Sequence, residues 1–231
     1  MVSKLNKNRK TYIVVFFMII SVILIVSVFF IKDDYKILKM GNNISMNTTE
    51  DITKYILNIS SYSAKIELTI NSNKNTNKYI LIQQFVSPNI SKQEILEPSN
   101  IKGLTMTFDG DNLKIENTYL KINHIYKNYN YLSNNNLFLD SFIEDYKNSK
   151  DKKTYEEKDM YIMETKCESN NRYIVSKKLY IDKSTSKPIR MEVNDVNQST
   201  LVYILYNEIK INSTKTEEVL AFKTSDYLFD I

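Results

Sequence analysis

The chain has 231 residues, 42% of them hydrophobic, with 31 basic and 27 acidic side chains and a formal net charge of +4. Four N-terminal cations, Lys4, Lys7, Arg9 and Lys10, equal this excess, so the rest of the chain is neutral. Phosphate binding needs an uncompensated basic surface, which argues against a nucleic-acid partner. A single cysteine, Cys167, excludes an intrachain disulfide.

Residues 12–31 are continuously apolar and carry no charge. A helix of this length measures about 30 Å, which matches the hydrocarbon core of a bilayer. Since the basic residues precede it, residues 1–11 are expected in the cytoplasm and everything after the span outside. The aromatic side chains of the predicted membrane anchor are Tyr12, Phe16, Phe17, Phe29 and Phe30.

The apolar segment is too long for a cleaved signal peptide, and no small-residue cleavage site follows it. A lipoprotein signal would need a cysteine directly after the apolar core, and the sequence has none there. We therefore predict an uncleaved, single-pass signal anchor in the cell membrane. Residues 32–46 are a polar linker, and residues 47–231 form one extracytoplasmic domain, long enough for a core of its own.

A short helix is predicted at the start of this domain. Thr48 can cap it, with Asp51 three residues later in the capping-box position. Ile52, Tyr55, Ile56 and Ile59 follow at helical spacing and form one apolar face. That face is expected to cover a sheet, because the hydrophobic period changes to two immediately afterwards.

Most of the remaining chain is predicted to form antiparallel strands, because polar and apolar residues alternate between turn signals. Residues 119–131 are rich in Tyr and Asn and fit no element, residues 148–153 are a charged loop, and residues 137–146 are a second helix with an apolar stripe. The tail Glu217–Phe222 is expected to add an edge strand. The predicted strands are 62–70, 78–86, 90–96, 103–108, 113–117, 161–167, 173–182, 189–193 and 201–211.

This order predicts the α+β class, with a large curved antiparallel sheet and helices on its concave face. Strands and helices do not alternate regularly, which argues against a parallel sheet.

No catalytic constellation is present in the sequence. His124 is the only histidine, so it cannot build a multi-histidine metal site, and no nucleophile motif accompanies it. Cys167 follows a predicted strand and is interpreted as a small packing residue. Three glycines cannot form a phosphate-binding loop. We expect no enzyme activity, no cofactor and no metal.

Two groups of strand segments resemble the LolA-like lipoprotein-carrier fold. The first comprises residues 62–68, 79–85 and 94–98, and the second residues 179–182, 188–193 and 203–212. Within that superfamily, the segment Glu94–Gly103 is most similar to the clostridial spore-germination lipoprotein family GerS. The resemblance implies an open half-barrel sheet and a non-enzymatic protein that docks a cortex peptidoglycan amidase. This chain lacks the lipobox cysteine of that family, and a membrane anchor would replace the lipid. The resemblance implies that this anchor lies in the forespore membrane or the spore envelope.

Two functions remain open from the sequence. One is a membrane-tethered protein that docks a protein partner of the cell envelope, either as a monomer or as a homodimer. The other is a carrier or sensor that holds a lipid or acyl chain on the concave face of the sheet. The apolar residues that would form either a core or such a ligand face are Ile66, Leu68, Leu81, Phe85, Met106 and Phe108.

Overall fold

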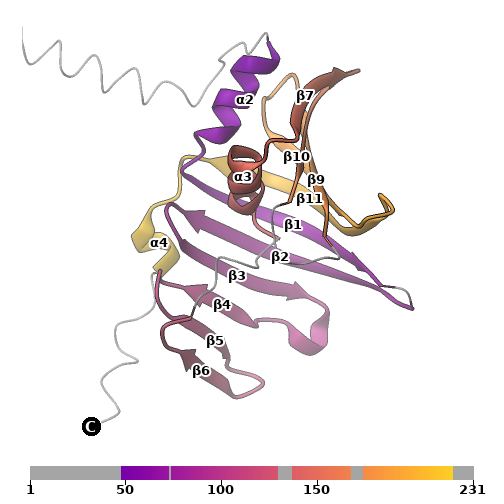
Figure 1. Ribbon diagram of the computed structural model, residues 1–231. Helices are drawn as coiled ribbons and strands as arrows, with labels where there is room; N and C mark the ends of the chain where they lie inside the picture. Colours follow the sequence, from indigo (N-terminus) through magenta and orange to yellow (C-terminus); the bar gives the residue numbers. More distant parts are fainter. Residues whose placement is uncertain (1–47, 73, 130–136, 168–173, 221–231) are drawn as a thin grey trace, which may run out of the picture. The chain divides into compact units, whose positions relative to one another are not determined.

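The computed structural model of the chain (Figure 1) describes residues 48–72, 74–129, 137–167 and 174–220. All of them lie in one compact unit, Met46–Ile231. The predicted anchor, the basic residues before it and the linker lie outside the described residues. Among the described residues, no helix is both long and apolar enough to cross a membrane.

The described strands form a single antiparallel sheet of eleven strands, in the spatial order β6-β5-β4-β3-β2-β1-β11-β10-β9-β8-β7 (Figure 1). The first half of the sheet contains β1 (Ser61–Asn71), β2 (Thr76–Val86), β3 (Ile90–Glu97), β4 (Thr105–Phe108), β5 (Leu113–Asn117) and β6 (Ile122–Tyr126). The second half contains β7 (Lys152–Glu157), β8 (Met160–Lys166), β9 (Ser176–Asp182), β10 (Pro188–Asn194) and β11 (Thr200–Ile211).

Each half is a meander, and the two halves are joined where the first strand pairs with the last. The β1–β11 ladder runs from Tyr62 opposite Ile211 to Ile70 opposite Val202. The chain leaves the sheet at one edge, β6, and re-enters it at the other edge, β7. The helix α3 (Leu139–Asn148) lies in this connection and packs on β8.

Two helices cover one face of the sheet, which we call the inner face. The first, α2 (Thr49–Leu57), begins at Thr48, whose hydroxyl accepts the Asp51 N–H at 3.1 Å and contacts the Asp51 carboxylate at 2.8 Å. The predicted cap is therefore confirmed. Ile52 and Ile56 of α2 and Leu139 and Phe142 of α3 are fully buried in one core cluster with side chains of both meanders.

The start of α3 is held by residues of β1 and β2. Phe138 stands at its N-cap and provides no side-chain hydrogen bond. The Tyr62 hydroxyl accepts the Leu139 N–H at 3.1 Å instead, and donates to Gln83 Oε1 at 2.6 Å. Since a helix start leaves N–H groups unpaired, this buried tyrosine takes over the role of a capping side chain.

Two predictions about individual elements need correction, and one segment left unassigned contains a strand. The tail Glu217–Phe222 is not a strand where it is described, because α4 (Thr216–Leu220) is helical there and buries Val219, in contact with β2 and β3. The predicted loop 148–153 ends inside strand β7. The unassigned segment 119–131 contains strand β6. A short 3-10 helix, η2 (Ser99–Ile101), separates β3 from β4.

Candidate protein-interaction edge

The edge strand β6 and its flanks carry a cluster of exposed apolar side chains. Of the seven large hydrophobic residues exposed in the described part of the chain, six lie between residues 119 and 129. Tyr119 is the most exposed of them, at 90%. We call this set the edge patch: Tyr119, Leu120, Ile122, Ile125, Tyr126 and Tyr129. Such a concentration on a folded domain marks an interaction surface, because isolated exposed apolar residues are normally scattered.

The edge patch is positioned by a hairpin with β5. Leu113 lies opposite Tyr126, and Asn117 lies opposite Ile122. Leu113 is buried on the inner face, so Tyr126, His124 and Ile122 point to that same side, while Ile125 and Asn123 point to the outer face. The strand thus presents apolar side chains on both faces.

Aromatic contacts organise the patch. The rings of His124 and Tyr126 meet edge to face at a centroid distance of 4.4 Å, and the Tyr126 and Tyr129 rings lie 6.0 Å apart. The Tyr129 N–H donates to the Asp111 carbonyl at 2.7 Å, which fixes the segment after β6 to the preceding turn. These contacts give the exposed rings a defined arrangement before any partner arrives, which lowers the entropic cost of binding.

Both ends of β6 are basic. Lys121 and Lys127 flank the strand, and neither ammonium group pairs with an acid in the described part of the chain. In contrast, Lys114 on β5 contacts Glu116 at 2.8 Å. The apolar side chains of the edge patch therefore lie on and beside a strand that has an unpaired positive charge at each end.

The outer face of the second meander differs from this edge, because its charges neutralise one another. Glu164 on β8 lies 3.2 Å from Lys153 and 3.8 Å from Lys178, and Arg190 Nε lies 3.3 Å from Glu192. The Arg190 guanidinium also stacks on the Tyr180 ring at 3.6 Å. The basic side chains named here therefore have an acidic neighbour on the same face, unlike Lys121 and Lys127 at the edge.

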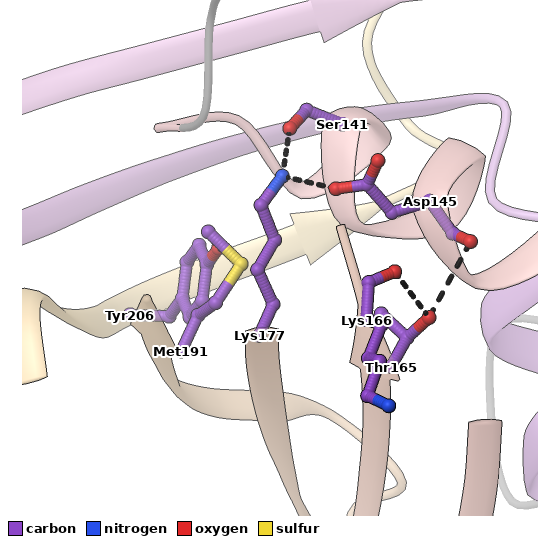
Figure 2. Close-up of polar contacts among 7 residues, drawn as sticks. All are labelled: Ser141, Asp145, Thr165, Lys166, Lys177, Met191 and Tyr206. Atoms are coloured by element: carbon purple, nitrogen blue, oxygen red, sulfur yellow. Dashed lines mark hydrogen bonds and ion pairs between the residues drawn. The ribbon is translucent and has the colours of Figure 1, made fainter. Parts of the chain in front are cut away.

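A buried polar cluster lies between α3 and the inner face of the second meander (Figure 2). Lys177 on β9 is fully buried, and its Nζ lies 2.7 Å from Asp145 Oδ2 and 2.5 Å from Ser141 Oγ, both on α3. The Thr165 hydroxyl of β8 lies 3.4 Å from the Asp145 backbone carbonyl and 3.2 Å from the Lys166 carbonyl, and it can donate to either one. The cluster fixes α3 on the sheet.

Burial perturbs three groups around this cluster. It raises the pKa of Asp140 to about 7, and Asp140 Oδ1 has no hydrogen-bond partner among the described residues. It raises the pKa of Cys167 to about 12, and it also raises the pKa of Tyr206. The Tyr206 hydroxyl contacts the Met191 sulfur at 3.9 Å (Figure 2). Burial therefore favours the neutral thiol of Cys167 and the neutral phenol of Tyr206 in the folded protein.

The structure separates the residues that could have formed a catalytic pair. His124 lies on one edge strand, whereas Cys167 follows β8 beside the other edge, with eight strands between β6 and β8 in the sheet order. Within the described ranges, no group of three or more His, Cys, Asp or Glu residues could hold a metal ion.

The residues considered for a ligand face are placed as follows. Ile66, Leu68, Leu81 and Phe85 belong to the core cluster, Phe108 is buried outside it, and Met106 is half-buried on β4. Contact of these residues with a lipid stays a prediction. The anchor residues Tyr12, Phe16, Phe17, Phe29 and Phe30 and the cations Lys4, Lys7, Arg9 and Lys10 lie outside the described residues.

The sequence analysis did not single out the edge patch or Lys177. The patch gives no alternation signal, because every residue of β6 is exposed. The burial of Lys177 could have been predicted from the sequence. Residues 173–182 were predicted to form a strand, and in a strand Lys177 lies on the same face as Leu179 and Ile181. A lysine in register with buried residues indicates either a charge partner or a site.

The described residues form a single open antiparallel sheet with two helices packed on one face and an apolar edge strand. The chain belongs to the sporulation protein YdcC-like family, whose sequence pattern matches residues 11–220. No curated protein matches the sequence.

Several solved structures are similar. One is the CwlD amidase from Clostridioides difficile in complex with the GerS lipoprotein, with 25% identity, a TM-score of 0.45, and coverage of 72% of this chain and 95% of that chain. The LolA superfamily protein NE2245 from Nitrosomonas europaea shows 12% identity, a TM-score of 0.42, and coverage of 78% and 99%. The MucA/MucB complex of Pseudomonas aeruginosa shows 11% identity, a TM-score of 0.42, and coverage of 75% and 61%.

Proposed function

We propose that this chain is a non-enzymatic, membrane-anchored docking protein of sporulating cells, and that the edge patch binds an envelope protein. The carrying observation is that six of the seven exposed large hydrophobic side chains in the described residues lie on one sheet edge. Membership of a sporulation family gives the cellular setting. The sequence resemblance of Glu94–Gly103 to the GerS family suggests a cortex peptidoglycan amidase as the partner.

The proposed anchor is the apolar segment 12–31, which lies inside the range matched by the family pattern, residues 11–220. The outer domain then projects into the cell envelope. Mass spectrometry of the membrane-bound protein should find residues 4–10 still attached. A mature N-terminus near Lys32 would contradict the anchor.

Docking is favoured over lipid carriage by the packing of the inner face. Side chains of α2 and α3, among them Ile56 and Phe142, form one buried cluster with Ile66, Leu81 and Phe85 of the sheet. A carrier would need those sheet residues to line a cavity of several hundred Å³. A reproducible lipid-sized adduct on the full chain in native mass spectrometry would favour the carrier function instead.

The test measures binding of the full chain, in detergent micelles, to the sporulation amidase encoded by the same genome. Replacing Ile125 and Tyr126 by Lys should weaken binding at least about thirtyfold, since central aromatic and apolar contacts at interfaces contribute about 2 kcal/mol or more. The matched control is Val196→Lys, the one exposed large hydrophobic residue of the described chain outside the patch. Equal binding by wild type and the double variant would refute the proposed docking surface.

A further inference from the structure

Building on the proposed function, we propose that β6 takes up its partner by strand addition. The added segment is an extended strand of another protein that alternates apolar and polar residues and carries a carboxylate near each end. The inference goes beyond docking as such, because it specifies backbone pairing and the chemistry of the partner.

The backbone of β6 is available for pairing. In the part of the chain that the structure describes, β6 pairs with β5 on one side and with no strand on the other. Folded proteins usually protect such an edge with a charge, a proline or a bulge, by keeping the strand very short, or by covering it. The strand Ile122–Tyr126 contains no charged residue and no proline, and its ladder with β5 has no register shift. It is therefore a template that an extended segment can prolong.

The side chains of β6 define what the added strand should present. Ile122, His124 and Tyr126 point to the inner side and Asn123 and Ile125 to the outer side. Neighbouring strands place opposite residues about 5 Å apart on the same face. A partner strand with apolar residues at alternate positions on the inner side would cover Ile122 and Tyr126, while polar residues between them would face Asn123.

The lysines at the two ends of β6 indicate which charge the ends of the partner strand should carry. Lys121 and Lys127 are six positions apart, or about 20 Å in an extended chain. Neither has an acid partner among the described residues, although the Asp111 backbone contacts Tyr129, two residues after Lys127. Carboxylates about six residues apart on the added strand would complement both ends, most strongly at Lys121.

The same charges disfavour a second copy of this chain as the occupant. An antiparallel pair of two β6 strands about a two-fold axis would place Lys121 of one copy beside Lys127 of the other. A parallel pair would place each lysine beside its own counterpart. Like charges directly opposite each other destabilise strand pairing in both arrangements.

The probe is a fluorescent peptide, Glu-Val-Thr-Val-Ser-Val-Glu, and its matched control has Lys in place of both Glu. Anisotropy titration of the full chain in micelles should give at least tenfold tighter binding of the acidic peptide. Lys121→Glu should remove that preference and restore binding of the lysine-ended peptide. Absence of binding, or equal binding of the two peptides to wild type, overturns the proposal.

Backbone pairing is tested with Asn123→Pro and His124→Pro. Adjacent N–H groups of a strand point to opposite edges, so one proline removes a bond to β5 and the other removes a donor from the open edge. The variant that keeps the circular dichroism spectrum of wild type should lose peptide binding at least tenfold. If neither variant keeps that spectrum, amide hydrogen exchange of the wild-type protein is measured with and without the peptide. Strand addition predicts that the peptide protects residues 122–126. Unchanged peptide binding by the folded variant, or no protection, overturns strand addition.

Failure of strand addition and failure of the proposed function give different results. If the folded proline variant still binds the amidase while the Ile125→Lys/Tyr126→Lys variant does not, docking at the edge patch holds and strand addition is wrong. If the lysine double variant binds the amidase as wild type does, the proposed function itself fails. A wild-type dimer in sedimentation that the lysine double variant converts to monomer would overturn the proposal in favour of a second copy.

Discussion

Replacing Lys177 by Met should destabilise the domain strongly, because it leaves a charge without its partner under α3. The Lys177 side chain is fully buried, and its ammonium group contacts both Asp145 and Ser141. Removing one member of a buried ion pair typically costs about 3–5 kcal/mol. Asp145 is 18% exposed, so water screens the remaining carboxylate, and we expect about 3 kcal/mol.

The neighbouring residue provides a matched control. Lys178 lies on the opposite face of the same strand, is 26% exposed, and approaches Glu164 only to 3.8 Å. Glu164 keeps Lys153 when Lys178 is replaced. Lys178→Met should therefore cost under about 1 kcal/mol. Adding Asp145→Leu to Lys177→Met should recover at least half of the loss, because both charges are then gone.

The assay is urea unfolding, followed by circular dichroism and by tyrosine fluorescence, since the chain has 17 Tyr and no Trp. The free energy of unfolding follows from the midpoint and the slope of the transition. Losses within about 0.5 kcal/mol of each other for Lys177→Met and Lys178→Met would refute the reasoning, because the burial and the ion pair of Lys177 would then be without effect.

Three further predictions concern titration, reactivity and folding. Burial raises the pKa of Asp140 from 3.8 to about 7, so the unfolded chain releases a proton that the folded protein keeps, and stability falls as pH rises through that window. Asp140→Asn should be as stable as wild type near pH 4 and more stable near pH 8, by up to about 4 kcal/mol; parallel pH curves for the two proteins would contradict this. Burial raises the pKa of Cys167 to about 12, so iodoacetamide should label it at least about a hundredfold more slowly in the folded protein than in urea, and Cys167→Ala should leave amidase binding unchanged; rapid labelling of the folded protein would count against it. A fragment from Asn47 to Ile231 should fold alone with a β-rich circular dichroism spectrum that a chelator does not alter; a helix-dominated spectrum would be inconsistent with the single sheet.

The elements that could be predicted from the sequence are those with one buried face. Strand β1 alternates Ala64, Ile66 and Leu68 with exposed or half-buried residues, and α2 repeats its buried isoleucines at helical spacing. In both cases the requirement to bury one face leaves its period in the sequence. The LolA-like resemblance rested on such strands.

The two strands that the sequence analysis missed are the two edges of the sheet. β6 is exposed at every residue, and β7 (Lys152–Glu157) has no buried residue. A strand that buries neither face shows no alternation of polar and apolar residues in its sequence. Its extended conformation then depends on hydrogen bonds to the neighbouring strand. The candidate site lies on one of these strands, and for the same reason it could not be predicted from the pattern. The wrong assignment of the tail has another cause, because five helical residues are too few to show a period.

Amide hydrogen exchange of the full chain, with and without the amidase, tests the central claim most directly. Exchange reports which backbone N–H groups become protected, so it locates a docked partner. We predict that binding protects residues 119–129 at the β6 edge and leaves the outer face of β8–β11 unchanged. Protection of β8–β11 or of α2, with no change at β6, would contradict the account.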